Sequence, residues 1–267
     1  MLENTLKRGE NRSALDANLV NFWSLYGQAP GCSLQTAPGA MGYVTGIPHP
    51  MYNGAIVWRD PGEALDEFYQ GLRRARFGTT VPALWWLGPS AQSTALCDRL
   101  AGMGLTEVGQ SPGMVAEIGK LEEPPRVRGL HITEARTEEE RRIWGLLAAE
   151  ASGHTHTGIV SLGRIEQSLT GMTPEEHTRY LAMQGGAPVA AAARVISDGL
   201  VGIYALAVLP EMRRMHIGSA LTWALMTHGA AKGQRWAAAH ATSAAGLALF
   251  TKMGFAEICH YRHFSQS

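Results

Sequence analysis

The apolar and polar positions of this chain follow two periods, which predict where strands and helices lie in its second half. Short apolar runs and alternating positions predict strands, whereas apolar residues recurring at i, i+3 and i+4 predict helices. Strands are predicted at residues 177–183, 187–196, 200–208, 235–241 and 255–264. Helices are predicted at residues 137–150, 164–170, 214–232 and 244–253, with a polar loop at 151–163. A helix, a meander of strands and then alternating strands and helices predict a mixed α/β sheet.

Turn and cap residues agree with these limits. Gly185 and Gly186 separate two of the strands, and residues 197–199 separate the next two, as in tight hairpin turns. Thr137 and Glu140 have the spacing of a capping box at the first helix. Gly254 stands where a helix would end in a left-handed residue.

The first half of the chain repeats part of this order. Strands are predicted at residues 53–58 and 83–87, and helices at 63–76 and 91–102. The Met-Gly-apolar-x-Glu-apolar pattern at 103–108 recurs at 253–258, after the last helix of each half. The repetition predicts one shared topology for both halves. The alternative is that the pattern is a common junction between a helix and a strand.

A domain boundary is predicted at residues 121–128. This segment has two acids, the Pro124-Pro125 pair and two arginines, and it can continue neither a helix nor a central strand. It divides the chain into residues 1–123 and 129–267, both of ordinary domain size.

Composition narrows the class of protein. A hydrophobic content of 45% with 17% charged residues is typical of a globular chain with a large core. The 23 basic and 23 acidic residues balance, so no nucleic-acid partner is expected. Cys32, Cys97 and Cys259 are too few and too dispersed for a disulfide framework, which favours a cytoplasmic protein. No apolar run or leader-like segment predicts a membrane partner. The sequence leaves open whether the protein forms a homodimer.

The segment at residues 199–221 carries the most chemical information. An apolar strand runs into Pro210, then Arg213 and Arg214, and then an apolar-striped helix. A bend before a helix N-terminus lets a diphosphate approach unpaired backbone N–H groups. The plainer alternative is a helix start with solvated arginines. The corresponding segment of the first half, residues 60–67, is acidic instead, so we expect one anion site per chain.

Two motifs in the second half resemble those of the GNAT superfamily of acyl-CoA-dependent N-acetyltransferases. Residues 206–210 and then Arg213 to Gly218 are similar to a strand with an apolar-x-Val-x-Pro end followed by Gln/Arg-x-x-Gly-x-Gly/Ala. Residues 243–255 resemble the later pattern Asn-x-x-Ala-x-x-Leu-Tyr-x-Lys-x-Gly-Phe. Residues 45–54 and 112–114 look like the degenerate first domain of tandem-GNAT bacterial proteins.

The resemblance implies a fold of two GNAT-like mixed, mostly antiparallel sheets flanked by helices. Residues 1–123 would be the degenerate domain and 129–267 the catalytic domain. The implied activity is direct transfer of an acetyl group from acetyl-CoA to a primary amine of a small acceptor, in a ternary complex. The residues expected to bind the cofactor are Leu206, Ala207, Val208, Arg213, Arg214, Met215, His216, Ile217, Gly218, Ser219, Ser243 and Phe250.

The chain departs from the family pattern at three of these positions. His216 stands where the first glycine is usual, and Ser243 replaces asparagine. Phe250 replaces the tyrosine that serves many members as general acid, and phenylalanine cannot donate a proton. These departures leave open a non-catalytic acyl-CoA-binding or regulatory protein. Small residues at 190–193 leave open a longer acyl chain, or close sheet packing.

Candidates for proton transfer are Tyr204 and His240, on two neighbouring predicted strands. Tyr204 would suit a proton donor or an orienting hydroxyl, and His240 a base; the alternative for both is packing against the sheet. His154 and His156 lack a third ligand nearby, so no metal is expected. Trp85 and Trp86 are expected to shape the acceptor cleft.

Overall fold

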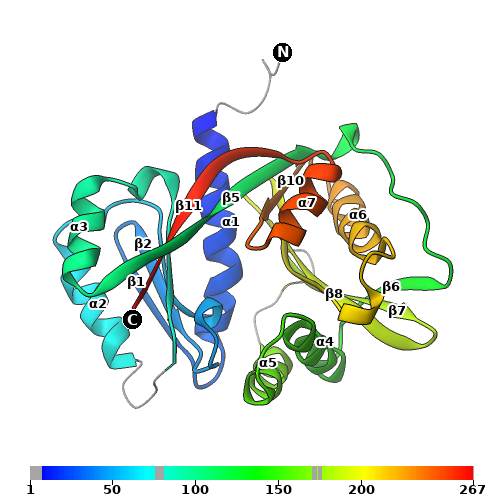
Figure 1. Ribbon diagram of the computed structural model, residues 1–267, viewed down its shortest axis with the longest axis horizontal. Coiled ribbons are helices and arrows are strands. Elements are labelled where there is room, and N and C mark those ends of the chain that lie inside the picture. The colour runs from blue at the N-terminus through cyan, green and yellow to red at the C-terminus, as the bar shows by residue number, and fades with distance from the viewer. Residues whose placement is uncertain (1–7, 76–80, 170–172, 174–175, 267) are drawn as a thin grey trace. The chain divides into compact units, whose positions relative to one another are not determined.

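The structure of the protein is a computed structural model that describes residues 8–75, 81–169, 173 and 176–266 (Figure 1). The chain forms two compact units, one of Met1–Gly113 with Ile258–Ser267 and one of Met114–Glu257. The boundary differs from the one expected at residues 121–128. Pro124 and Pro125 lie in a loop inside the second unit, because a proline pair interrupts secondary structure without ending a domain.

Two strands explain why the units divide where they do. Strand β5 (Leu105–Glu117) begins in the first unit and ends in the second, where Met114 and Ala116 enter the core. Strand β11 (Ala256–Gln266) ends the chain, yet it pairs antiparallel with β4 of the first unit. Figure 1 shows the red β11 lying along the green β5. A cut in sequence order therefore cannot separate the units.

The first unit is a mixed sheet with helices on both faces. Its strands follow the order β1-β2-β3-β4-β11-β5, in which β3 and β4 are parallel and the other recorded pairs antiparallel. Its other elements are α1 (Arg8–Gln28), β1 (Ser33–Ala37), β2 (Ala40–Val44), η1 (Pro50–Tyr52), β3 (Asn53–Val57), α2 (Ala64–Ala75), β4 (Leu84–Leu87), η2 (Pro89–Ala91) and α3 (Thr94–Gly102).

The two faces of this sheet have different cores. On one face Tyr43 stacks on Trp23 of α1, with ring centroids 5.0 Å apart. On the other face Leu72 of α2 lies against Gly42, because neighbouring strand residues point to opposite sides. Trp85 and Trp86 are 3% and 1% exposed in these cores. Their expected role in shaping an acceptor cleft is therefore wrong; their size serves packing.

The second unit has the same mixed architecture. Its strands follow the order β5-β10-β9-β8-β7-β6, with β9 and β10 parallel and the pairs from β9 to β6 antiparallel. Its elements are η3 (Ile118–Lys120), β6 (Leu130–Glu134), α4 (Glu138–Ala151), α5 (His156–Ser168), β7 (His177–Gln184), β8 (Ala187–Ser197), β9 (Leu200–Val208), η4 (Pro210–Met212), α6 (Ile217–Ala230), β10 (Trp236–His240) and α7 (Ala244–Lys252).

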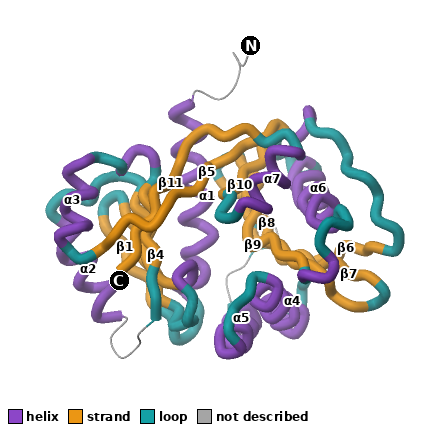
Figure 2. Tube along the Cα trace, in the orientation of Figure 1, coloured by secondary structure: helices purple, strands orange, loops and turns teal. Residues whose placement is uncertain are grey.

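Helices cover both faces of this second sheet as well (Figure 2). Helices α6 and α7 share a core with Val201 and Ile203 of β9. On the opposite face Arg179 of β7 forms a fully buried ion pair with Glu166 of α5, at 2.9 Å, and its guanidinium lies over the ring of Trp144 in α4. The predicted fold class, mixed and mostly antiparallel sheets flanked by helices, is confirmed.

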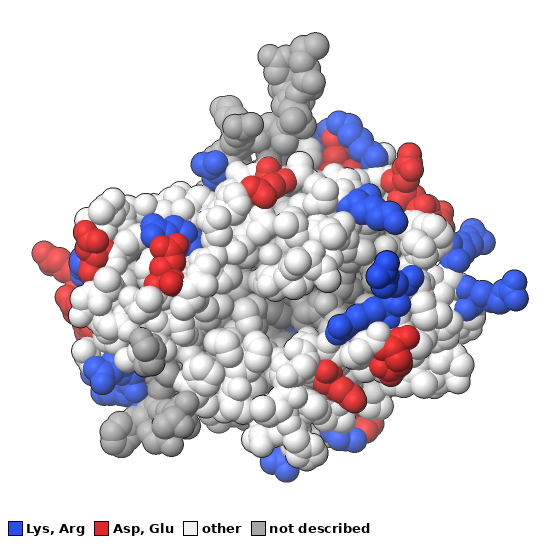
Figure 3. Space-filling view, in the orientation of Figure 1, with Lys and Arg blue, Asp and Glu red and all other residues white. Residues whose placement is uncertain are grey.

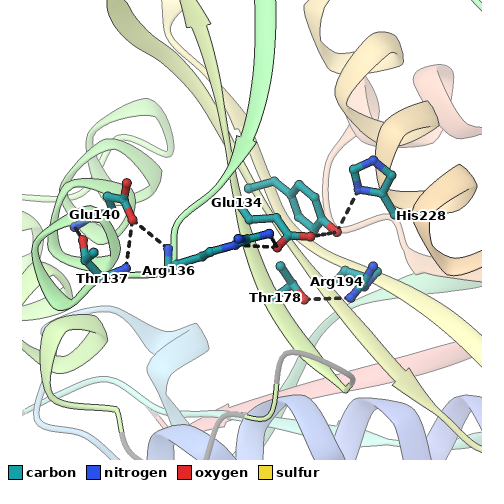
Figure 4. A network of polar contacts seen from close by, with 8 residues as sticks. Glu134, Arg136, Thr137, Glu140, Thr178, Arg194 and His228 are labelled. Carbon is teal, nitrogen blue, oxygen red and sulfur yellow. Dashed lines mark hydrogen bonds and ion pairs between the residues drawn. The ribbon is translucent and has the colours of Figure 1, made fainter. Parts of the chain in front are cut away.

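A second polar network ties α6 to the strands beneath it (Figure 4). Tyr180 of β7 donates a hydrogen bond to Glu134 of β6 and lies 3.1 Å from Nδ1 of His228 in α6. Beside it, the buried Arg194 donates to Thr178 at 2.7 Å. The predicted capping box at Thr137 and Glu140 is also present. The contact between Tyr180 and His228 holds α6 against the strands of the sheet.

Helices α5 and α6 begin at places other than those predicted, for different reasons. Helix α5 starts at His156, inside the predicted loop, because Thr155 accepts a hydrogen bond from the N–H of Gly158 and caps it. Helix α6 starts at Ile217 rather than at residue 214, because Arg214 and His216 have left-handed backbone angles (φ 63° and 61°).

The repetition between the two halves extends to the geometry of matching residues. Ser93 and Ser243 each cap a nine-residue helix by accepting a hydrogen bond from a backbone N–H three residues on. Gly104 and Gly254 follow these helices with φ of 83° and 88°. Matching caps, helix lengths and end residues favour a shared topology over a common local junction.

A buried carboxyl group joins the first and last elements of the first unit. Asp16 of α1 is 6% exposed and accepts a hydrogen bond of 2.6 Å from the hydroxyl of Tyr261 in β11. Burial raises the pKa of Asp16 from 3.8 to about 7, although the hydrogen bond from Tyr261 opposes the shift. Nearby, burial lowers the pKa of His263 from 6.5 to about 4.

The raised pKa makes stability of the first unit depend on pH. The folded state holds a proton on Asp16 that the unfolded state has lost, so this stabilisation is complete below pH 3.8 and disappears as pH rises through about 7. Asp16→Asn keeps an acceptor for Tyr261 and cannot ionise. We expect its effect on the free energy of unfolding to be about 2–3 kcal/mol more favourable at pH 8 than at pH 5.

Urea unfolding at the two pH values measures this difference, and His263 contributes equally to both proteins. Asp98→Asn, at an exposed position of α3, is the matched control and should show no such difference. Equal effects of Asp16→Asn at both pH values would contradict the assignment.

Candidate functional site

The central feature of the second unit is the early end of the ladder between β9 and β10. The two parallel strands pair from Leu200 with Trp236 to Ile203 with Ala239. Strand β9 continues for five more residues, 204–208, which still pair with β8 as far as Val208. Within the described chain, these residues therefore have no ladder on their β10 side. The backbone N–H and C=O groups of residues 205–207 on that side remain open to a ligand, whereas the carbonyl of Val208 accepts a hydrogen bond from Arg213.

A β-bulge lies where the ladder ends. Ala207 pairs with Ala191 and Tyr204 with Ala193, so β9 holds one residue more than β8 over this stretch. The extra residue is Ala205, with φ of 48°. A bulge re-aims the strand that carries it, and left-handed geometry is unfavourable for alanine. The bulge thus turns the end of β9 away from the course of β10.

The corresponding place in the first unit is closed. Strands β3 and β4 pair up to Val57 with Leu87, the last residue of each strand. The N–H of Gly88 then donates to the carbonyl of Val57 at 2.8 Å, which continues the contact past both strands. No equivalent opening exists in the described part of that unit.

The loop after β9 forms a concave array of backbone N–H groups. Arg214 and His216 are left-handed, and His216 caps α6 without any side-chain hydrogen bond. No N–H group of residues 214–219 donates to another described group. Left-handed residues next to right-handed ones turn successive N–H groups to one side, and the helix dipole adds positive potential. The geometry is that of an anion-binding site.

The matching loop of the first unit holds an anion of its own. Gly62 is left-handed (φ 60°), and its N–H donates to a carboxylate oxygen of Asp60 at 2.9 Å. Arg99 lies 3.8 Å from Asp60 and 3.7 Å from Asp66. A carboxylate from the chain thus takes the position that the second unit leaves open, as the acidic sequence predicted.

The two arginines of the motif have different surroundings. Arg213 donates one hydrogen bond of 3.0 Å to the carbonyl of Val208 and another of 2.8 Å to the carbonyl of Ala151, at the end of α4. Its guanidinium therefore braces the loop rather than facing a ligand, which differs from the role expected for its side chain. Arg214 is exposed and forms no hydrogen bond or ion pair within the described chain.

The structure brings the two candidates for proton transfer together at the opening. Tyr204 is the first residue of β9 beyond the ladder, and His240 is the last of β10. Their rings are stacked, with centroids 6.2 Å apart. Burial raises the pKa of Tyr204 well above 10, so its hydroxyl keeps its proton and can donate a hydrogen bond.

Other expected cofactor residues have structural roles that the sequence did not show. Phe250 is 5% exposed and packs on Phe255 in the core, so its ring is not offered to a ligand. The hydroxyl oxygen of Ser243 accepts the N–H of Gly246 as a helix cap. The side chain of Ile217 is buried, whereas Met215 is 43% exposed.

The remaining members of the expected set lie along the opening or in the first turn of α6. Leu206 and Val208 are half-buried against the core, and Ala207 is 7% exposed. Gly218 and Ser219 are half-buried at the helix N-terminus. A Cβ on Gly218 would lie 3.7 Å from Val208, at an ordinary contact distance.

Two features of this site were missed by sequence reasoning. The carbonyl of Ala151 anchors Arg213, and no residue type signals such a contact. The bulge at Ala205 lies in an alanine-rich strand without a glycine to mark it. No group of three or more metal-ligating side chains occurs among the residues described, and His154 and His156 are half-buried and exposed respectively.

The left-handed backbone of His216 gives a test of the loop geometry. Glycine adopts φ of 61° without the steric cost that histidine bears there. We expect His216→Gly to raise the free energy of unfolding by about 1 kcal/mol. Met215→Gly is the control, because Met215 does not have positive φ, and it should destabilise the protein. Thermal and urea unfolding measure both, and destabilisation by both substitutions would contradict the geometry.

Three solved structures share this fold across nearly the whole chain. A GCN5-related N-acetyltransferase from Kribbella flavida has 19% identity and a TM-score of 0.65, with 95% of each chain covered. A conserved protein of unknown function from Staphylococcus epidermidis has 14% identity and a TM-score of 0.63, covering 94% of this chain and 98% of that one. A tandem GNAT protein from the clavulanic acid biosynthesis pathway has 14% identity and a TM-score of 0.58, covering 98% and 94%.

At these identities the likeness concerns the fold. No curated protein matches the chain. Residues 137–255, inside the second unit, match the model of the acetyltransferase (GNAT) family. The match covers less than half of the chain, so the likeness to the acetyltransferase (GNAT) family concerns this domain of the second unit.

Proposed function

We propose that the second unit binds acetyl-CoA and transfers its acetyl group to a primary amine of a small acceptor, in a ternary complex. One observation carries the proposal. The open side of β9 lies beside the backbone N–H groups of residues 214–219, to which no described side chain binds. An extended polar chain attached to a diphosphate fits these two features. The extended chain can pair with the open strand edge, and the diphosphate can bind the N–H groups.

The residues in the opening suit the parts of coenzyme A. The backbone N–H groups from Arg214 to Ser219 would bind the diphosphate, with the exposed guanidinium of Arg214 and the ring of His216 beside it. Residues 206–208 would pair with the amide groups of the pantetheine arm along the open side of β9. Neither feature occurs in the described part of the first unit, so we assign it no coenzyme site.

Acyl transfer at this place needs a proton acceptor and a proton donor. The amine nitrogen would attack the thioester carbon, and a backbone N–H near Ala207 or Val208 would stabilise the oxyanion. His240 would take the proton that the amine loses. As the carbon–sulfur bond breaks, the leaving thiolate would take the proton of Tyr204, whose buried hydroxyl is protonated at neutral pH.

A second candidate function is acyl-CoA binding without catalysis. It is favoured by Phe250, which stands in the core where many relatives are expected to have a tyrosine acid. Transfer of a longer acyl chain gains less support, since Ala190 to Ala193 are 0% exposed and thus belong to close sheet packing.

The distribution of charge on the surface gives no reason to revise the partners expected from the sequence. Basic and acidic side chains are interspersed on the face drawn in Figure 3, with uncharged residues over most of it. A small amine remains the proposed acceptor, and the absence of nucleic-acid and membrane partners and a cytoplasmic location stay predictions. No helix in the described ranges has the length and apolar character needed to cross a bilayer.

Calorimetry with CoA tests binding and separates the roles of the two arginines. Arg214→Gln removes an exposed charge beside the diphosphate, so we expect about tenfold weaker binding at low salt and a smaller loss at high salt. Arg213→Gln removes two contacts that hold the loop, so its loss should be the same at both salt concentrations. No binding of CoA or acetyl-CoA by the unmodified protein would refute the proposal.

Thiol release from acetyl-CoA with a panel of amines tests catalysis. We expect Tyr204→Phe to lower kcat by about a hundredfold while the Kd for CoA is unchanged, because the hydroxyl acts on the leaving group. Tyr43→Phe, at a buried tyrosine of β2 in the first unit, is the control and should keep kcat. If CoA binds but no amine gives thiol release, the non-catalytic alternative replaces transfer.

A further inference from the structure

The outer edge of β1 is open in the first unit. Strand β1 stands at the end of the strand order, and no described strand pairs on the side away from β2. Natural edge strands are protected by charges, prolines or bulges. Residues 33–37 carry no charge and no proline, and they pair with β2 in unbroken register. This edge therefore presents a regular row of N–H and C=O groups.

A groove of about 470 Å³ runs beside this edge. One wall is formed by residues 35–38, and the other by one face of α2, namely Ala64, Glu67, Phe68, Gly71 and Arg74. The side chain of Gln35 occupies the space that a Cβ on Gly71 would need. The middle of β1 thus lies beside the middle of α2. Because Gly71 has no side chain, β1 can approach the helix closely at that point.

Two opposite charges stand on the helix wall of this groove. Glu67 and Arg74 are exposed, and neither forms a hydrogen bond or an ion pair within the described chain. They are seven residues apart on α2, which is a rise of about 10 Å along the axis and too far for them to pair with each other. Gly71 lies between them, near the centre of the groove.

We propose that this groove and edge bind a second copy of the chain. The two β1 strands would pair antiparallel around a two-fold axis near Gln35, which extends the sheet from one copy into the other. The two α2 helices would then run antiparallel on the same face. Glu67 of each copy would lie opposite Arg74 of the other, which gives two ion pairs in one isologous interface.

The charge arrangement is the reason for choosing a second copy over another partner. Opposite charges placed on either side of a central glycine complement themselves under a two-fold rotation. An extended peptide could use the strand edge, but nothing in the groove selects its sequence. The balanced net charge of the chain also allows two copies to approach without long-range repulsion.

Sedimentation velocity of the full chain over a range of concentrations tests the proposal. A concentration-dependent dimer is expected. Arg74→Glu and Glu67→Arg each place like charges opposite each other twice, so each should raise the dissociation constant by about tenfold or more. The double variant Glu67→Arg/Arg74→Glu reverses both charges and should restore the dimer. Gln70→Glu, exposed on α2 but outside the groove, is the control and should dimerise as the unmodified chain does.

Three outcomes would overturn the proposal. They are a monomer at every concentration, a dimer that neither single charge reversal weakens, and single variants that the double variant does not rescue. The measurement needs neither CoA nor an acceptor, so it is independent of the proposed activity.

Discussion

The second unit depends on the point at which β9 and β10 stop pairing. Up to Ile203 the two strands form an ordinary parallel ladder, and beyond it β9 is held by β8 alone. A strand that loses its ladder on one side within a sheet exposes backbone polar groups, which is unfavourable unless a side chain, a ligand or water satisfies them. The bulge at Ala205 turns the strand at this point. The first unit repeats the parallel strand pair with its connecting helix, β3-α2-β4, but with a closed ladder, and the contrast makes the opening a feature of this site rather than of the fold.

The anion loop is shaped by its frame more than by its own sequence. Arg213 joins the end of β9 to the end of α4, and Tyr180 and His228 hold α6 against the strands. Within this frame, Arg214 and His216 adopt backbone angles that glycine would adopt more readily. Strain of this kind persists where the surrounding structure determines the conformation, and it is typical of binding sites. The parts that hold the loop are therefore distinct from the parts that face the ligand.

Much of this arrangement could be predicted from the sequence, and its limits have physical causes. Strand and helix periods located most elements, since burial of one face determines them. The start of α5 was missed because Thr155 caps it within a polar stretch that has no apolar period. The roles of Arg213 and Phe250 were misjudged for another reason, since a motif gives the position of a side chain but not its direction. The bulge at Ala205 could not be predicted from the sequence, because its backbone angle is imposed by neighbouring strands.

The place of β11 has a consequence for how the protein is made. Residues 258–266 are synthesised after the whole of the second unit, yet they complete the first unit. Until the entire second unit has been synthesised, the first unit therefore lacks β11. Asp16 then has no hydrogen bond from Tyr261, and β4 has no partner strand on one side. The second unit, although it comes later in the sequence, is therefore the first for which all residues are available to fold.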